Sequence, residues 1–292
     1  MKKILFKGVG TALYTPITDG KIDFKAYELL IDEQISAGVS ALIFLGTTGE
    51  SATIDDDERK EIVKFAVDYV SKRVPVIIGC GSNSTAKARK FTEQAKEYNA
   101  DGALCVTPYY NKCTQYGLIK HYEEINKSSI PIIIYNVPSR TGLNALPETE
   151  NDIADIEYVC GIKEANSDKR HIKKLFNLVN GKVAIYSGND SLNTFFYARK
   201  GIGTISVASN IIPDKIVEQF NDFTTFYDRH NFKNYKTINE LTDALFVEVN
   251  PIPLKAMLEI LGKDGTELRL PLTKATDDHY EYFIKLLHKL EL

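Results

Sequence analysis

Ile130-Pro131-Ile132-Ile133-Ile134-Tyr135 is the stretch that most directly indicates how the chain folds. It carries no charged side chain and no alternation of apolar and polar residues. A strand with one face in water shows that alternation, whereas a strand of a parallel sheet is buried on both faces and is apolar nearly throughout. Residues 130–135 therefore predict a strand of a parallel sheet.

Seven further stretches show this pattern, at residues 8–14, 41–45, 74–78, 103–106, 158–162, 183–186 and 203–207. Between them, apolar residues recur at steps of three and four, as in helices that bury one face. Residues 24–35 follow a possible cap at Asp23, and residues 88–95 follow Ser84. Strands that alternate with helices in this way form βαβ units, in which the crossover makes neighbouring strands parallel.

Two architectures contain such units: a closed barrel of eight strands and an open doubly wound sheet that binds dinucleotides. The count of eight strands favours the barrel. The open sheet also requires a G-x-G-x-x-G turn after its first strand, but residues 8–13 and 79–84 both lack the third glycine. We therefore predict an α/β fold of the (β/α)8 TIM-barrel class. We expect the catalytic barrel to span residues 1–224 and a C-terminal helical extension to span residues 225–292, because only helix-like patterns follow residue 211.

Composition and charge limit the classes of partner. The 292 residues include 36 basic and 39 acidic side chains, which give a formal net charge of −3 and form no basic block of the kind that binds nucleic acid or membranes. No stretch approaches the roughly 20 apolar residues of a membrane span, and the apolar run at residues 4–6 is too short for a signal peptide. The four cysteines show no C-x-x-C spacing, as is usual for reduced thiols. We expect a cytoplasmic protein with small-molecule substrates, no nucleic-acid partner and no membrane partner.

Lys163 is the most informative polar residue. Catalytic groups of a (β/α)8 barrel lie at the carboxyl ends of the strands, and Lys163 directly follows the apolar run 158–162. We expect its side chain to lie in the packed mouth of the barrel, where loss of water lowers the pKa of an ammonium group and leaves an amine that attacks ketones. The alternative is a structural lysine that pairs with a neighbouring carboxylate such as Glu164.

Hydroxyl groups on the same rim complete this chemistry. Formation and use of a Schiff base require proton transfer, first when the carbinolamine loses water and then when a methyl proton is removed. Tyr135, Thr47 and Tyr110 lie at the ends of other predicted strands, and hydroxyl groups both donate and accept hydrogen bonds. They are candidates for a proton relay, although a tyrosine at such a position often only packs its ring.

Two further features suit negatively charged substrates. Arg140 lies in the loop after Tyr135, and its planar guanidinium suits a carboxylate, whereas the alternative is a surface ion pair. Thr48 and the amides of residues 46–50 are candidates for binding a second carboxylate, although the glycines there also suit a turn. No histidine ends a predicted strand, so we expect no metal ion, and no sequence feature predicts a cofactor.

Three of these segments, residues 46–50, 135–138 and 161–164, resemble signatures of the dihydrodipicolinate synthase and N-acetylneuraminate lyase family of pyruvate-dependent class I aldolases. The resemblance covers essentially the whole chain, through residues 250–253. It implies that Lys163 forms a Schiff base with pyruvate. The further roles that it implies are proton transfer by Tyr135, Thr47 and Tyr110, binding of the pyruvate carboxylate by Thr48 and the backbone of Ile205, and a place near the substrate for Gly188.

Arg140 distinguishes two branches of that family. Members of the synthase branch bind the carboxylate of aspartate semialdehyde at such an arginine, so the resemblance implies condensation of pyruvate with this semialdehyde, the first committed step of diaminopimelate and lysine biosynthesis. The alternative is a sister aldolase or dehydratase that acts on a 2-keto-3-deoxy sugar acid or on N-acetylneuraminate, a branch that typically lacks the arginine. A barrel that binds a keto acid without catalysis is the alternative from outside the enzymes.

The same resemblance has implications for assembly and regulation. Members of the family are usually homotetramers built as dimers of dimers, in which the residue at the place of Tyr110 reaches into a neighbouring subunit's site. Lysine-inhibited members carry an acidic residue where this chain has Lys87, and often histidines where it has Asp56 and Arg59. Because a cation at Lys87 repels the ammonium group of lysine, we expect weak or absent inhibition by lysine.

Overall fold

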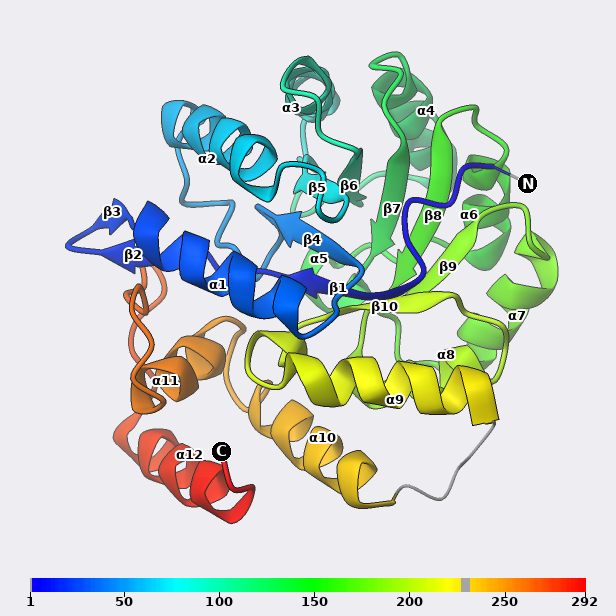
Figure 1. Ribbon diagram of the computed structural model, residues 1–292. Helices are drawn as coiled ribbons and strands as arrows, with labels where there is room; N and C mark the ends of the chain where they lie inside the picture. Colours follow the sequence, from blue (N-terminus) through cyan, green and yellow to red (C-terminus); the bar gives the residue numbers. More distant parts are fainter. Residues whose placement is uncertain (1, 227–231) are drawn as a thin grey trace.

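Eight parallel strands close into a barrel in the structure, a computed structural model that describes residues 2–226 and 232–292. Figure 1 shows helices around this barrel, whose strands are hydrogen-bonded in the order β1-β10-β9-β8-β7-β6-β5-β4 and back to β1. The barrel strands are β1 (Gly8–Ala12), β4 (Ala41–Phe44), β5 (Val76–Gly79), β6 (Gly102–Val106), β7 (Ile132–Asn136), β8 (Val159–Glu164), β9 (Ala184–Ser187) and β10 (Gly203–Ser206). The predicted TIM barrel is confirmed, and each apolar run that we expected to form a strand overlaps one, with bounds that differ by one or two residues.

Helices cover the outside of the barrel. They are α1 (Phe24–Ser36), α2 (Asp56–Val70), α3 (Thr85–Glu97), α4 (Gln115–Asn126), α6 (Pro147–Ala154), α7 (Lys169–Val179), α8 (Asn193–Tyr197) and α9 (Pro213–Phe226). The caps expected at Asp23 and Ser84 are confirmed, since these side chains accept hydrogen bonds from the backbone N–H groups of Ala26 and Lys87. Each cap satisfies one of the N–H groups that the start of a helix leaves unpaired.

Strand residues alternate between two apolar cores, one inside the barrel and one between the strands and the helices. On β7, Ile134 belongs to the outer core and Tyr135 to the inner one. In the register of β7 and β8, Tyr135 is the partner of Lys163, and Asn136 is the partner of Glu164. Tyr135 and Lys163 therefore share the inner face of the barrel, whereas Asn136 and Glu164 share its outer face.

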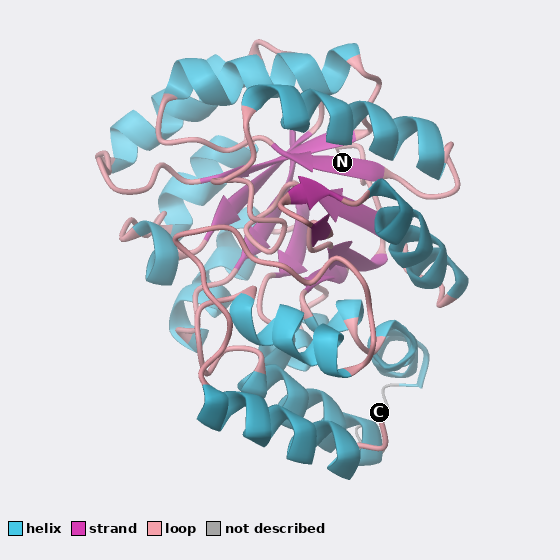
Figure 2. Cartoon of the chain, turned by 90° about the vertical axis from the view of Figure 1, so that its left-hand side faces the viewer, coloured by secondary structure: helices cyan, strands magenta, loops and turns pink. Residues whose placement is uncertain are grey.

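The C-terminal extension consists of α10 (Phe232–Ala244), α11 (Ile252–Ile260) and α12 (Asp277–Lys289). Figure 2 shows these helices gathered on one side of the barrel. No strand follows β10 in the described residues. The expected boundary between residues 224 and 225 lies inside α9, next to residues 227–231, which are outside the described residues, and it stays a prediction. Within the described ranges, no helix combines the length and apolarity that crossing a membrane requires.

A buried ion pair joins the extension to the barrel. Lys255 of α11 lies 2.5 Å from the carboxylate of Glu50 and donates a second hydrogen bond, of 2.6 Å, to the carbonyl oxygen of Glu267. The side chains of Lys255 and Glu50 are both excluded from solvent. Because Glu50 follows β4 in the same loop as Thr47 and Thr48, this contact fixes the extension against that loop.

Three short elements go beyond the predicted pattern. The strands β2 (Ile17–Thr18) and β3 (Lys21–Ile22) form an antiparallel hairpin after β1, and the single-turn helix α5 (Pro138–Thr141) follows β7. The hairpin contacts the extension, where Glu267 accepts hydrogen bonds from the backbone of its turn. Helix α5 carries Arg140 and thereby places that side chain over the carboxyl end of the barrel.

Candidate active site

A cavity of about 800 Å³ lies at the carboxyl ends of the barrel strands. Residues 246–250 of the C-terminal extension form part of its wall, so barrel and extension enclose it together. Most of the predicted site residues line this cavity: Thr47, Thr48, Tyr135, Arg140, Lys163 and Gly188. The structure thus brings together side chains from β7, β8 and from the loops that follow β4, β7 and β9.

Lys163 is a buried, unpaired amine beside an aromatic ring. Its side chain leaves β8 on the inner face, and its Nζ lies 4.2 Å from the centre of the Tyr135 ring. Burial lowers the pKa of Lys163 to about 7, while the Asp190 carboxylate raises it and Arg140 lowers it further. In the described part of the chain, no carboxylate lies within ion-pair distance of Lys163, and Glu164 points to the opposite face of β8. The alternative of a structural pair with Glu164 is therefore wrong.

Tyr135 and Thr47 form the nearest hydroxyl pair. Their side chains are hydrogen-bonded to each other. Burial raises the pKa of Tyr135 to about 12, and Arg140 and the bond from Thr47 act in the opposite direction. The Tyr135 hydroxyl therefore keeps its proton at neutral pH, in a position to donate it to a group bound at Lys163. This arrangement suits two members of the predicted relay.

Tyr110, the third relay candidate, lies outside this cavity in the single chain. It follows β6 in a loop with a positive φ of 68°, and 90% of its surface is exposed. An exposed tyrosine of this kind is free to contact another molecule, which agrees with the expectation that it serves a neighbouring subunit. That expectation stays a prediction.

Arg140 and Thr48 are joined by Asn250 of the extension. The carbonyl oxygen of Asn250 accepts a 3.0 Å hydrogen bond from the Arg140 guanidinium, and its side-chain amide donates one of 3.0 Å to the Thr48 hydroxyl. Thr48 and Asn250 are buried. The two candidate groups for carboxylate binding are thus held on one wall of the cavity, and Arg140 contributes a positive charge close to Lys163 and Tyr135.

Gly188 and Ile205 occupy different places relative to the cavity. A Cβ atom on Gly188 would lie 2.9 Å from the Cβ of Ala165 and 3.1 Å from the Cε of Lys163, so glycine leaves the space that the lysine side chain occupies. Ile205 lies within β10, buried in the inner core, and does not line the cavity. Val207, two residues farther on, does line it. The carboxylate-binding role of the Ile205 backbone stays a prediction.

Two residues near the site were not predicted from the sequence. Asp190 is buried, accepts hydrogen bonds from the backbone N–H groups of Val207 and Ala208, and is the main opposing influence on the pKa of Lys163. Asn250 follows no predicted strand and lines the cavity from the extension, so its only sequence signal was the resemblance at residues 250–253.

A second cavity, of about 590 Å³, adjoins the first and shares Arg140 and Asn250 with it. Lys87 and Arg59 line this second cavity. Arg59 is buried, donates a 2.7 Å hydrogen bond to the carbonyl oxygen of Gly79 and stacks on the ring of Phe91. Asp56 instead pairs on the surface with Lys90, at 2.7 Å. Of the three positions at which this chain differs from lysine-inhibited members, Lys87 and Arg59 thus line one cavity, whereas Asp56 does not line it.

The Dihydrodipicolinate synthetase family profile matches residues 5–290. The chain belongs to the dihydrodipicolinate synthetase family. As a member of this family, the protein is a carbon–carbon lyase of the aldolase type. The resemblance that three short segments indicated is confirmed.

Named relatives and solved structures agree with this membership. The 4-hydroxy-tetrahydrodipicolinate synthase of Alkaliphilus oremlandii is 48% identical over 270 residues, which cover 92% of this chain and 93% of that protein. The crystal structure of dihydrodipicolinate synthase from Thermotoga maritima is 42% identical, with a TM-score of 0.96 over 99% of both chains. A structure described as the first monomeric dihydrodipicolinate synthase variant is 43% identical, with a TM-score of 0.96 over 99% of this chain and 98% of that one.

Proposed function

We propose that this protein condenses pyruvate with L-aspartate 4-semialdehyde to 4-hydroxy-tetrahydrodipicolinate through a Schiff base on Lys163. The names of its relatives support the reaction. The observation that carries the mechanism is the buried Lys163 amine, with its lowered pKa, beside Tyr135. The reaction is the first committed step of diaminopimelate and lysine biosynthesis.

The first half of the reaction fixes pyruvate to the enzyme. The unprotonated amine of Lys163 attacks the keto carbon and forms a carbinolamine, which loses water to give an imine. Tyr135 donates the proton that the departing hydroxyl group needs, and Thr47, hydrogen-bonded to Tyr135, takes part in its return. Thr48 binds the pyruvate carboxylate on the same wall.

The second half forms the carbon–carbon bond. The relay of Tyr135 and Thr47 takes up a methyl proton, which converts the imine into an enamine. The enamine carbon attacks the aldehyde carbon of the semialdehyde, and the relay returns the proton to the aldehyde oxygen. Arg140 binds the carboxylate of the semialdehyde. The amino group of the semialdehyde then attacks the imine carbon, closes the ring and releases the amine of Lys163.

Assembly and location complete the proposal. We place Tyr110 of one subunit in the site of another, within a homotetramer built as a dimer of dimers. We place the enzyme in the cytoplasm, with no cofactor. The exposure of Tyr110 in the single chain supports the first of these statements.

The experiment that tests the mechanism is reductive trapping. Borohydride added in the presence of pyruvate should leave a stable adduct, which mass spectrometry of the digested protein should locate on Lys163. Lys163→Arg, which keeps the charge but not the reactive amine, is the matched control and should give no adduct. An adduct on another lysine, or none at all, contradicts the proposal.

A second experiment tests the branch of the family. Arg140→Ala should still form the pyruvate adduct but should lose most of its condensation with aspartate semialdehyde, because a carboxylate partner is missing. The wild type should cleave neither N-acetylneuraminate nor a 2-keto-3-deoxy sugar acid. Unchanged turnover of Arg140→Ala, or cleavage of either sugar acid by the wild type, would favour the sister-aldolase alternative. No feature of the described residues favours that alternative.

A further inference from the structure

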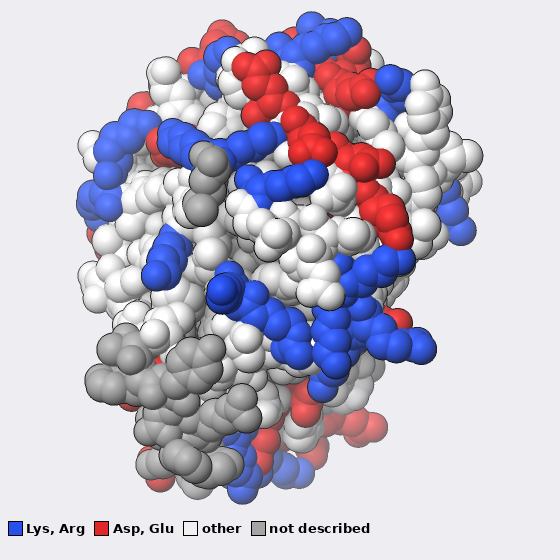
Figure 3. Space-filling model, turned by 90° about the vertical axis from the view of Figure 1, so that its right-hand side faces the viewer, with Lys and Arg blue, Asp and Glu red and all other residues white. Residues whose placement is uncertain are grey.

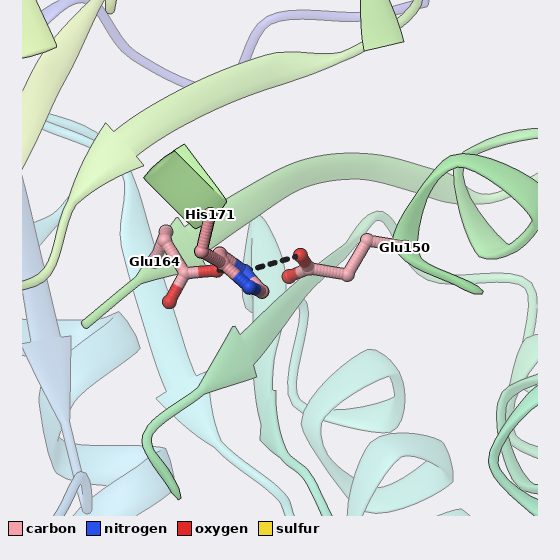
Figure 4. A group of neighbouring side chains, drawn as sticks. All are labelled: Glu150, Glu164 and His171. Atoms are coloured by element: carbon pink, nitrogen blue, oxygen red, sulfur yellow. Dashed lines mark hydrogen bonds and ion pairs between the residues drawn. The ribbon is translucent and has the colours of Figure 1, made fainter. Parts of the chain in front are cut away.

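A cluster of buried titratable side chains lies on the outer side of the barrel wall, behind Lys163. Figure 4 shows its three members, Glu164 of β8, Glu150 of α6 and His171 of α7, converging on one point. The Nε2 atom of His171 lies 3.0 Å from the Glu164 carboxylate and 3.4 Å from that of Glu150. Both carboxylates are excluded from solvent.

Glu164 is the best-satisfied member of the cluster. Its carboxylate accepts hydrogen bonds from His171, from the side-chain amide of Asn136 at 3.1 and 3.3 Å, and from the backbone N–H of Asn166 at 2.6 Å. The hydrogen bonds thus connect β7, β8 and the loop after β8.

The two carboxylates favour a protonated His171. Burial lowers the pKa of His171, but Glu150 and Glu164 outweigh this effect and raise it to about 10. Burial and the neighbouring Glu164 raise the pKa of Glu150 well above its usual range. The raised pKa favours the protonated form of His171, in which the ring nitrogen that faces the two carboxylates carries a hydrogen-bond donor.

The cluster is joined in register to the catalytic pair. Glu164 directly follows Lys163, Asn136 directly follows Tyr135, and the two pairs face each other across β7 and β8. The hydrogen bonds between Asn136 and Glu164 on the outer face therefore fix the backbone of β7 and β8 at the point where Tyr135 and Lys163 project from the inner face. His171 holds Glu164 in the orientation that makes these bonds.

We propose that His171 is a positioning residue for Schiff-base formation, which acts through Glu164 and Asn136 to keep the amine of Lys163 at its place beside Tyr135. The inference rests on the proposed function of Lys163. A metal site is the competing explanation, because the three ligand atoms lie within 4.8 Å of one another. The cluster offers three such atoms among the described residues, whereas a structural zinc site takes four protein ligands.

The test compares two substitutions of His171 in the full chain. His171→Leu removes the donor to Glu164, and His171→Gln keeps one. We expect His171→Leu to slow the formation of the borohydride-trapped pyruvate adduct about tenfold or more per folded molecule, because small misplacements of reacting groups have effects of this size. His171→Gln should recover most of the rate. Glu164→Gln keeps the shape of the side chain but weakens it as a hydrogen-bond acceptor, so it should slow adduct formation as well. This variant replaces His171→Leu in the test if His171→Leu does not fold.

His121 provides a matched control. It is another buried histidine on a neighbouring helix, α4, and its Nδ1 lies 2.9 Å from the hydroxyl of Thr85. His121→Leu should lower the melting temperature without slowing adduct formation by the folded protein. An equal slowing in His121→Leu and His171→Leu would overturn the inference, because it would reduce the effect to general destabilisation.

Two further outcomes separate this inference from its competitors. Adduct formation by His171→Leu within twofold of the wild type overturns the positioning role and leaves the proposed function standing, whereas a wild type without an adduct overturns both. Binding of one equivalent of added zinc by the wild type, lost in His171→Leu, overturns the inference in favour of a metal site.

Discussion

The charge state of Lys163 follows from its surroundings. Removal from water costs more free energy for an ammonium group than for an amine, and Asp190 acts in the opposite direction. With a pKa of about 7, roughly half of the molecules carry an unprotonated amine at neutral pH, whereas an ordinary lysine leaves fewer than about one in a thousand unprotonated. The barrel thus supplies the nucleophile without a separate base.

We expect Schiff-base formation to accelerate as the pH rises through about 7 and then to level off. The sign follows because the unprotonated amine is the form that attacks, and raising the pH removes the proton. The rate is measured by trapping the pyruvate adduct with borohydride at timed intervals over a series of pH values. A rate that keeps rising toward the ordinary lysine pKa of about 10 would contradict the lowered pKa.

L-Lysine should inhibit the enzyme weakly or not at all. Lys87 and Arg59 line the second cavity, so a ligand with two ammonium groups would meet two cations there. Activity is measured against increasing L-lysine, and we expect little change at sub-millimolar concentrations. Lys87→Glu should increase the sensitivity, with Lys90→Glu on the surface as the control. Half-inhibition of the wild type by sub-millimolar lysine would contradict this expectation.

Single residues differed in how far the sequence predicted them. Lys163 and Tyr135 were predicted because each ends an apolar run, and strand ends meet at one rim. Asn250 and His171 were not predicted as site neighbours, because their contacts join segments that are distant in sequence. The alternative pair of Lys163 with Glu164 was wrong for a simple reason: adjacent strand residues point to opposite faces.

At the scale of elements, the barrel strands were the most predictable part. A strand buried on both faces is apolar throughout, and that signal needs no knowledge of its partners. The hairpin of β2 and β3 and the single turn of α5 gave no such signal, because elements of two to four residues are too short to show a period. Their conformation depends on the extension and on the loop contacts that they make.

The buried pair of Glu50 and Lys255 gives a prediction about stability. Lys255→Met leaves the Glu50 carboxylate buried without its partner, so we expect a loss of about 3–5 kcal/mol in the free energy of unfolding. Glu50→Gln combined with Lys255→Met should recover much of it, since no unpaired charge remains. Urea unfolding followed by circular dichroism measures both.

An exposed pair provides the comparison. Lys274 and Glu259 lie 2.9 Å apart, and 78% of the Lys274 side chain is exposed. Lys274→Met should change the free energy of unfolding by no more than about 1 kcal/mol. Equal losses in Lys255→Met and Lys274→Met would show that burial is not the source of the effect.

At the scale of the whole molecule, the single chain leaves Tyr110 in solvent. Figure 3 shows lysine and arginine side chains gathered on the face that includes α7, where Lys169, Arg170, Lys173 and Lys174 are exposed. A two-fold contact places a surface against itself, so a contact centred on that face would bring like charges together. We therefore expect the contact that Tyr110 makes to use another part of the surface.

Mixing two inactive variants tests whether Tyr110 acts in a neighbouring subunit. Tyr110→Phe and Lys163→Ala should each have little activity. In a mixed oligomer, the subunit that keeps Lys163 would receive Tyr110 from its neighbour, so random mixing should restore about a quarter of the wild-type activity. Mass spectrometry of the intact oligomers confirms that the subunits have exchanged, because the two variants differ in mass. Exchange without recovery would show that Tyr110 acts within its own chain.

The wall that residues 246–250 contribute to the cavity has a consequence for synthesis on the ribosome. The last barrel strand ends at Ser206, so all eight strands, with Lys163 and Tyr135, are translated before residues 246–250. During that interval the cavity lacks the wall that residues 246–250 provide. We therefore expect a ribosome-bound chain that ends before residue 246 to have the carboxyl end of its barrel open to solvent on the side that this wall covers in the finished protein.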